Sequence, residues 1–288
     1  MGNRNFVPRL YFMQHDELFD ITFLGECDED YKMRPSSELF EEEVSAYPFV
    51  ALLELLSQQE IADKIIALRF ESPDKGANGM KDYNFKRLVD SGVTFPNLKH
   101  FSVGLTKPTD HNTGIMVSEG SSCEEKGIIA RLVSIMPELR FLAVPSAPNK
   151  SFFEIGPLKL TELIVQAELD RQNFIENLAN SDNLPELQFL DYSDYQLVLP
   201  HMAGTETPFE SYKKLFLSPL FQQECFWGFW LRNSILTAPQ LSALETISKY
   251  VRGKDKRDIS FCHISSRYEY VEESMYSNVW LLEKLRKE

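Results

Sequence analysis

Few residues of this sequence have the types and spacing that catalysis or metal binding requires. The chain lacks the glycine-rich patterns that cradle phosphates, the G-x-S-x-G pattern of a nucleophilic serine and the H-E-x-x-H pattern of a zinc site. Its histidines do not pair at ligand spacing: His15, His100, His111, His201 and His263. The sequence therefore predicts no metal, no cofactor and no enzyme activity.

Two clusters keep a chemical alternative open. Asp110 and His111 stand in a polar, turn-rich stretch and could supply a ligand or a base, although a solvated loop is the preferred interpretation. Asp191 and Asp194, close to Tyr192 and Tyr195, could bind a cation, although ordinary turn chemistry is preferred. The alternative to a non-enzymatic protein is therefore an enzyme, or an accessory subunit of one, with its site in inserted loops.

The charge and composition exclude several classes of partner. The chain has 288 residues, 43% of them hydrophobic, and a formal net charge of −13. This length and composition allow a large core. Phosphate contacts and anionic lipid surfaces both require clustered Lys and Arg, so we expect no nucleic-acid partner and no membrane attachment.

The sequence also indicates a cytoplasmic protein. Residues 1–6 lack the apolar core of a signal peptide, and the longest apolar stretch, Phe49–Leu56, is too short to span a bilayer. The four cysteines lie far apart, so we expect reduced thiols: Cys27, Cys123, Cys225 and Cys262.

One pattern recurs along the chain: an apolar residue, two variable residues, an apolar residue, one variable residue and an apolar residue. The first, second and third anchors are 65-68-70, 98-101-103, 139-142-144, 160-163-165 and 187-190-192, with weaker copies at 212-215-217 and around Ile259-x-Phe261. The last two anchors of a copy are two residues apart, so on an extended chain they point to the same side. Each copy is predicted to be a short strand with one buried face.

Helical patterns precede several copies, which predicts a parallel sheet with helical return segments. The expected helices lie around residues 85–89, 128–133 and 174–178, with longer ones at 48–62 and 238–251. Two wide intervals between copies require inserted polar loops, at 72–79 and 107–121.

At these residues, over about 48–264, the chain resembles a divergent leucine-rich repeat protein and is similar to cytoplasmic bacterial members of that family. Three intervals between first anchors fall within the roughly 20 to 29 residues of such repeats. The resemblance implies an α/β fold: a curved solenoid with a parallel sheet on the concave side, helices on the convex side and capped ends. An ordinary α/β domain with a few similar strands is the alternative.

The ends of the chain differ from its middle, as the ends of a solenoid must. Residues 1–47 are predicted to be an N-terminal cap with two strands, 6–13 and 18–24, and residues 48–264 the solenoid. Residues 265–288 are predicted to be a C-terminal cap, with a helix over 274–287.

Residues between the anchors must point away from the core and form the exposed face of the sheet. Four of them would form an apolar group there, and charged residues would form its rim, which is typical of a binding site. The predicted partner-binding residues are Arg69, Phe141, Glu162, Ile164, Phe189, Asp191, Lys214 and Phe216. The alternative is that a loop covers these side chains, or that a register slip of one residue exchanges the two faces.

A second aromatic stretch, Phe221–Leu231, contains two of the three tryptophans and could form an interface, although core packing is preferred. The sequence as a whole predicts a non-enzymatic protein that binds a protein partner through the concave face of a leucine-rich repeat solenoid.

Overall fold

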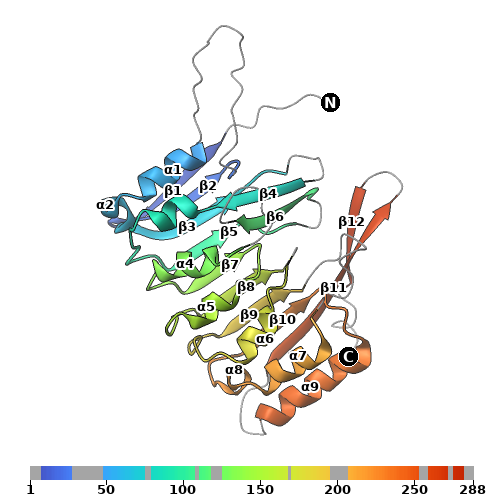
Figure 1. Cartoon of the computed structure of the whole chain (residues 1–288). Helices are drawn as coiled ribbons and strands as arrows, with labels where there is room; N and C mark the ends of the chain where they lie inside the picture. Colours follow the sequence, from blue (N-terminus) through green and yellow to red (C-terminus); the bar gives the residue numbers. More distant parts are fainter. Residues whose placement is uncertain are drawn as a thin grey trace.

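The structure is a computed structural model and describes residues 8–27, 48–74, 79–107, 110–117, 125–167, 170–194, 207–252, 259–271 and 275–281. It is a mixed α/β fold with one large, mostly parallel sheet (Figure 1). The strands are β1 Arg9–His15, β2 Leu18–Leu24, β3 Ile65–Glu71, β4 Gly79–Asn84, β5 His100–Val103, β6 Asn112–Val117, β7 Phe141–Val144, β8 Glu162–Gln166, β9 Phe189–Ser193, β10 Gly228–Arg232, β11 Ser260–Val271 and β12 Met275–Leu281.

The order of the strands in the main sheet follows their order along the chain. The sheet runs β1-β2-β3-β5-β7-β8-β9-β10-β11-β12, and β4 and β6 form a separate parallel pair. The outermost pairs of the main sheet, β1–β2 and β11–β12, are antiparallel, and the inner pairs are parallel. Each inner strand therefore pairs with the strands that precede and follow it in the main sheet.

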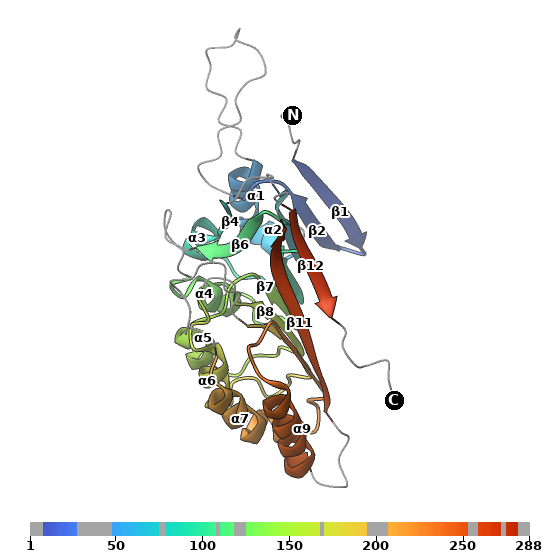
Figure 2. The same ribbon diagram turned by 90° about the vertical axis from the view of Figure 1, so that its right-hand side faces the viewer.

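Helices cover one side of this sheet. Figure 2 shows α3 to α7 as a column along one side of the main sheet. The helices are α1 Pro48–Leu56, α2 Gln59–Ala62, α3 Lys86–Asp90, α4 Ile128–Ser134, α5 Lys150–Glu154, α6 Phe174–Ala179, α7 Phe209–Leu217, α8 Pro219–Gln222 and α9 Ala238–Arg252. Most of them are short, so they are stabilised chiefly by packing on the sheet.

The predicted anchors form the core between sheet and helices. All fifteen anchors of the five strong copies are buried, and the second anchors Leu68, Phe101, Leu142, Leu163 and Leu190 are partners across adjacent strands. The predicted strands and their register are therefore confirmed for these copies. The large mostly parallel sheet with helices is confirmed as well.

Some predicted elements are wrong. The copy at 212-215-217 lies in helix α7, and β10 takes the next place in the sheet. The predicted helix at 48–62 is divided into α1 and α2. The predicted C-terminal helix is instead strand β12 over Met275–Leu281, because β11 offers an edge that this Tyr-, Val- and Trp-containing segment can pair with. Residues 282–288 lie outside the described ranges.

The inserted segments are more ordered than predicted. Strand β6 lies inside the segment expected to be a loop at 107–121, and it pairs in parallel with β4, which follows the insertion at 72–79. The two N-terminal strands are confirmed as a hairpin whose two-residue turn has Asp16 at φ 55°.

Candidate binding face

The face of the main sheet opposite the helices, here named the open face, is defined by two rows of residues that are partners across the strands. One row is Ala67, His100, Phe141, Glu162, Phe189, Gly228 and Ser260, and the next is Arg69, Ser102, Ala143, Ile164, Asp191, Trp230 and Cys262. Six predicted site residues are in these rows: Arg69, Phe141, Glu162, Ile164, Phe189 and Asp191. The structure thus brings them together on one face.

Two predicted site residues do not belong to this face. Phe216 is fully buried in the core, where its ring stacks on Phe221 at 4.3 Å and meets Phe261 edge-on. Lys214 is exposed on the same helix, α7. Their predicted placement on the exposed sheet face is wrong. Tyr212, Leu215 and Phe216 have the i, i+3, i+4 spacing of one side of a helix, and the expected third anchor, Leu217, is exposed.

Tryptophans of the neighbouring segment take the expected place of Phe216. Trp230 is the partner of Asp191 on the open face, and Trp227, just before β10, is 48% exposed. The signal that could have located this strand is Phe226-x-x-Phe229-x-Leu231, a further copy of the anchor spacing with all three anchors buried. The predicted core packing of residues 221–231 is therefore confirmed for these three anchors, and it is wrong for Trp227.

Aromatic rings form two groups on the open face. In the first, the rings of His100 and Phe141 stack in parallel with centroids 4.1 Å apart. In the second, Phe189 stacks on Trp227 at 5.0 Å and meets Trp230 edge-on at 5.2 Å.

Gly228 makes the second group possible, because a Cβ at this position would lie 2.7 Å from Cδ2 of Phe189. Ile164, half-buried, lies on the strand between the groups.

Two ion pairs lie beside these rings. The Arg232 guanidinium donates to both carboxylate oxygens of Asp191, with Nε–Oδ1 and Nη2–Oδ2 distances of 2.6 and 2.7 Å, and it lies 5.3 Å from the Trp230 ring centroid. Arg69 donates to the carboxylate of Asp20 on β2. The charges of Arg69 and Asp191 are therefore paired within the molecule, and these residues hold the face in shape.

His100 is neutral at physiological pH. Burial, and then the charge of the nearby Arg69, lower the pKa of its imidazole from 6.5 to about 4, against an opposing effect of Asp20. The stacked pair of His100 and Phe141 is therefore an uncharged aromatic surface at pH 7.

We expect this histidine to make stability depend on pH. Between pH 6.5 and about 4 the unfolded chain binds a proton that the folded His100 rejects, so the free energy of unfolding falls as pH falls through this window. The contribution is about 1 to 2 kcal/mol, below the full linkage value because the ring is only half-buried. Urea unfolding at pH 7.0, 5.5 and 4.5 should show wild type losing stability relative to His100→Phe, which keeps a ring against Phe141. If the free energy of unfolding changed with pH equally in wild type and His100→Phe, the lowered pKa of His100 would be contradicted.

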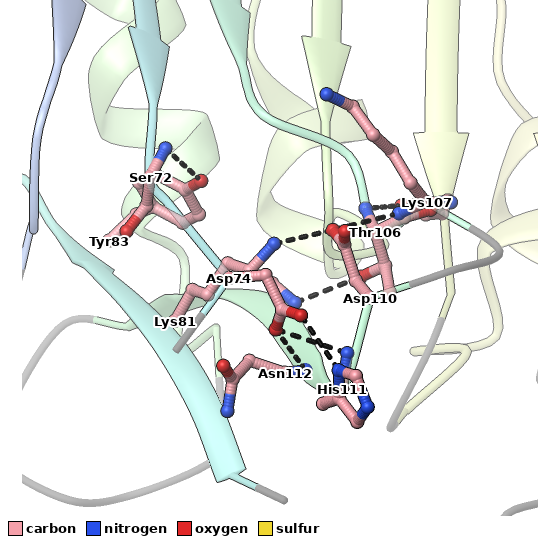
Figure 3. A network of polar contacts seen from close by, with 11 residues as sticks. Ser72, Asp74, Lys81, Tyr83, Thr106, Lys107, Asp110, His111 and Asn112 are labelled. Atoms are coloured by element: carbon pink, nitrogen blue, oxygen red, sulfur yellow. Dashed lines mark hydrogen bonds and ion pairs between the residues drawn. The ribbon is translucent and has the colours of Figure 1, made fainter. Parts of the chain in front are cut away.

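A separate polar network lies where β3 and β5 end (Figure 3). Asp74 accepts hydrogen bonds from the backbone N–H groups of His111 and Asn112, both at 3.0 Å, and its Oδ2 lies 2.8 Å from Nδ1 of His111. Burial raises the pKa of Asp74, but these hydrogen bonds outweigh it and lower the pKa below its usual value. His111, predicted to lie in a solvated loop, is therefore tied to the other inserted segment through Asp74.

The same network contains a buried ion pair. Nζ of Lys81 on β4 donates to Oδ2 of Asp110 at 2.5 Å, and both side chains are almost fully buried. A cavity of about 140 Å³ lies beside them, lined also by Tyr83 and Lys107. The contacts join the two inserted segments to each other, which accounts for the pairing of β4 with β6.

Thr106 and Gln166 fix the inserted segment to the main sheet. The Thr106 N–H donates to Oε1 of Gln166 at 2.8 Å, and Nε2 of Gln166 donates back to the Thr106 carbonyl at 3.0 Å. Oγ1 of Thr106 also accepts from the N–H of Gly114. The side chain of one strand thus anchors a segment that follows another strand, which sequence spacing could not reveal.

The second chemical cluster is also built from internal contacts. The buried Asp194 carboxylate accepts hydrogen bonds from the hydroxyls of Tyr212 at 2.6 Å and Thr207 at 2.8 Å. Burial, and then the charge of Asp194, raise the pKa of Tyr212 well above its usual value, so the phenol stays a donor. Tyr195 lies outside the described residues.

Other sequence predictions concern the thiols, metals and membranes. Cys27, Cys225 and Cys262 are free, with Cys27 buried and Cys225 exposed; Cys123 lies outside the described ranges. Within those ranges, no three His, Cys, Asp or Glu side chains form a group that could hold a metal ion. In the same part of the chain, no helix combines the length and the hydropathy needed to cross a bilayer.

Comparison with known proteins gives no family for this chain, so its function has to be inferred from the structure. The chain matches no protein-family model, and neither a curated protein nor a solved structure shows significant similarity to it.

Proposed function

We propose that this chain is a non-enzymatic, cytoplasmic solenoid of the leucine-rich repeat type that binds a protein partner through its open face. Support for the solenoid comes from the sequential order of the parallel strands and from the helices on one side. A doubly wound α/β sheet has helices on both faces and a reversal in its strand order, where ligands bind. The anchors buried in matching positions of five successive strands are those that a stacked repeat requires.

The observation that carries the binding proposal is the pair of aromatic groups on the open face. Aromatic side chains are enriched at the energetic centres of protein interfaces, and charged side chains lie around them. Here His100, Phe141 and Phe189 lie on strands of the sheet, and Trp227 stacks on Phe189 just before β10. The ion pairs Arg69–Asp20 and Arg232–Asp191 lie beside the two groups. Such a surface is preorganised, so little conformational entropy is lost when a partner docks.

The inserted segments support a structural role in preference to a catalytic one. Asp74 accepts hydrogen bonds from the N–H groups of His111 and Asn112. Asp110 accepts one from the Lys107 N–H and is neutralised by Lys81, which also donates to it. We infer that this network positions β4 and β6 and is not a reaction centre.

Charged substitutions on the open face should abolish partner binding. Phe141→Glu and Trp227→Glu place a carboxylate where the proposed partner buries apolar surface, and each should reduce recovery of a stoichiometric partner by about 10-fold or more. The measurement is quantitative affinity capture from a lysate of the organism that makes the protein, with thermal unfolding used to show that each variant is folded.

Two helix-side variants provide the matched control. Leu55 on α1 and Leu217 on α7 are large, exposed apolar residues away from the open face, at 38% and 47% exposure. Leu55→Glu and Leu217→Glu should retain the partner. Equal loss of the partner in the open-face and helix-side variants would overturn the proposal, as would the absence of a specific partner for the wild-type chain.

A further inference from the structure

Glu162 is an exposed carboxylate in the first row of the open face. Two nearby carboxylates are neutralised by arginines: Asp20, the partner of Ala67 on β2, pairs with Arg69, and Asp191 pairs with Arg232. Within the described part of the chain, the Glu162 side chain makes no hydrogen bond or ion pair with another group. A carboxylate on a rigid strand of a recognition surface, without an internal cation, is available to a cation from outside.

The register places this carboxylate between aromatic side chains. Glu162 is the partner of Phe141 on β7 and of Phe189 on β9, and adjacent strands are about 4.8 Å apart. The half-buried Phe141 ring is held by its stack on His100, and Trp227 covers Phe189 while remaining 48% exposed. Glu162 therefore lies between two fixed aromatic groups, with Ile164 next to it on the same strand and face.

We propose that this position binds an arginine side chain of the protein partner. Arginine suits the site because its planar guanidinium can stack on an aromatic ring while its N–H groups donate in pairs to one carboxylate. Ile164 would contact the apolar neighbour of that arginine. The net charge of −13 favours approach of a basic segment over an acidic one.

This inference rests on the proposed function and can be tested with synthetic peptides. The immobilised full chain is used to select binders from a library of random peptides, and we expect arginine to be enriched at one position. The best peptide and its citrulline counterpart, which has the same shape but no charge, are then titrated by fluorescence anisotropy. Citrulline should weaken binding to the wild-type chain by about 10-fold or more.

The variant Glu162→Gln should weaken the arginine peptide by the same factor and leave the citrulline peptide nearly unaffected. The matched control is Glu60→Gln, which removes one exposed carboxylate from helix α2 and should change binding by less than about 2-fold. Trp227→Ala should weaken both peptides, because it removes part of the aromatic surface.

The outcomes separate the two proposals. Peptides that bind, and that Trp227→Ala weakens, but that show no arginine enrichment or no response to Glu162→Gln, would overturn the arginine site and leave the binding face standing. Selected peptides unaffected by Trp227→Ala and Glu162→Gln, or a library that gives no binder at all, would overturn both.

Discussion

Replacing Asp194 with alanine should lower the free energy of unfolding by about 3 kcal/mol. The carboxylate is 1% exposed and accepts hydrogen bonds from Tyr212 on α7 and Thr207 just before that helix, with a longer one from Tyr192 on β9. Removing the acceptor leaves buried hydroxyls unsatisfied, and each such group costs about 1 to 3 kcal/mol. The cluster joins the end of β9 to α7. Because the substitution leaves the surface exposed on unfolding nearly the same, the urea midpoint should fall while the slope of unfolding free energy against urea stays unchanged.

Tyr212→Phe provides the graded control for this prediction. It removes one hydroxyl and keeps the ring in the core, so it should cost only about 1 kcal/mol. An Asp194→Ala variant within about 1 kcal/mol of wild type would show that the carboxylate contributes little.

Replacing Lys81 with methionine should cost about 3 kcal/mol by leaving the buried Asp110 carboxylate without its cation. The two side chains are 5% and 11% exposed, and removal of one partner of a buried pair is usually far more damaging than replacement of both. Methionine keeps most of the volume of the lysine stem, so lost packing contributes little. Urea unfolding of the variant and wild type measures the difference.

A double-mutant cycle checks that this cost comes from the pair. The variants are Lys81→Met, Asp110→Leu and the double substitution, and the double variant should be more stable than the sum of the single losses implies, by about 1 to 3 kcal/mol. Additive losses would contradict direct coupling between Lys81 and Asp110.

The core is more predictable from sequence than the surface, for a physical reason. A buried anchor such as Leu142 or Leu163 must be apolar at a fixed spacing, because water is excluded around it, and this constraint recurs in each strand. The five copies can therefore be aligned from their spacing alone. Their alternation then places Phe141, Glu162, Phe189 and Asp191 on the opposite face, because side chains of a strand alternate between faces.

The sequence cannot distinguish a helix from a strand where two neighbouring segments both show the apolar spacing expected of a buried element. Tyr212, Leu215 and Phe216 satisfy a helix, and Phe226, Phe229 and Leu231 satisfy a strand, yet both sets show apolar spacing. Packing decides: Phe229 enters the sheet beside Leu190, and α7 lies over it with Phe216 against the Phe229 ring. Spacing therefore does not identify Trp227 and Trp230 as residues of the open face.

Long-range polar contacts are beyond prediction for a different reason. Hydrogen bonds such as those from His111 to Asp74 or between Thr106 and Gln166 join residues 37 and 60 positions apart, and no periodicity relates them. Only the folded arrangement of the inserts brings these groups together.

The sequential order of the strands has a consequence for how the chain can accommodate extra length. Because β3 and β5 are neighbours, segments added after each of them leave the sheet at the same edge and side by side. These two additions became β4 and β6, which pair with each other from Gly79 and Asn112 onward while β3 and β5 keep their register. This strand order allows segments inserted after two neighbouring strands to pair with each other, and the other strands of the main sheet keep their positions.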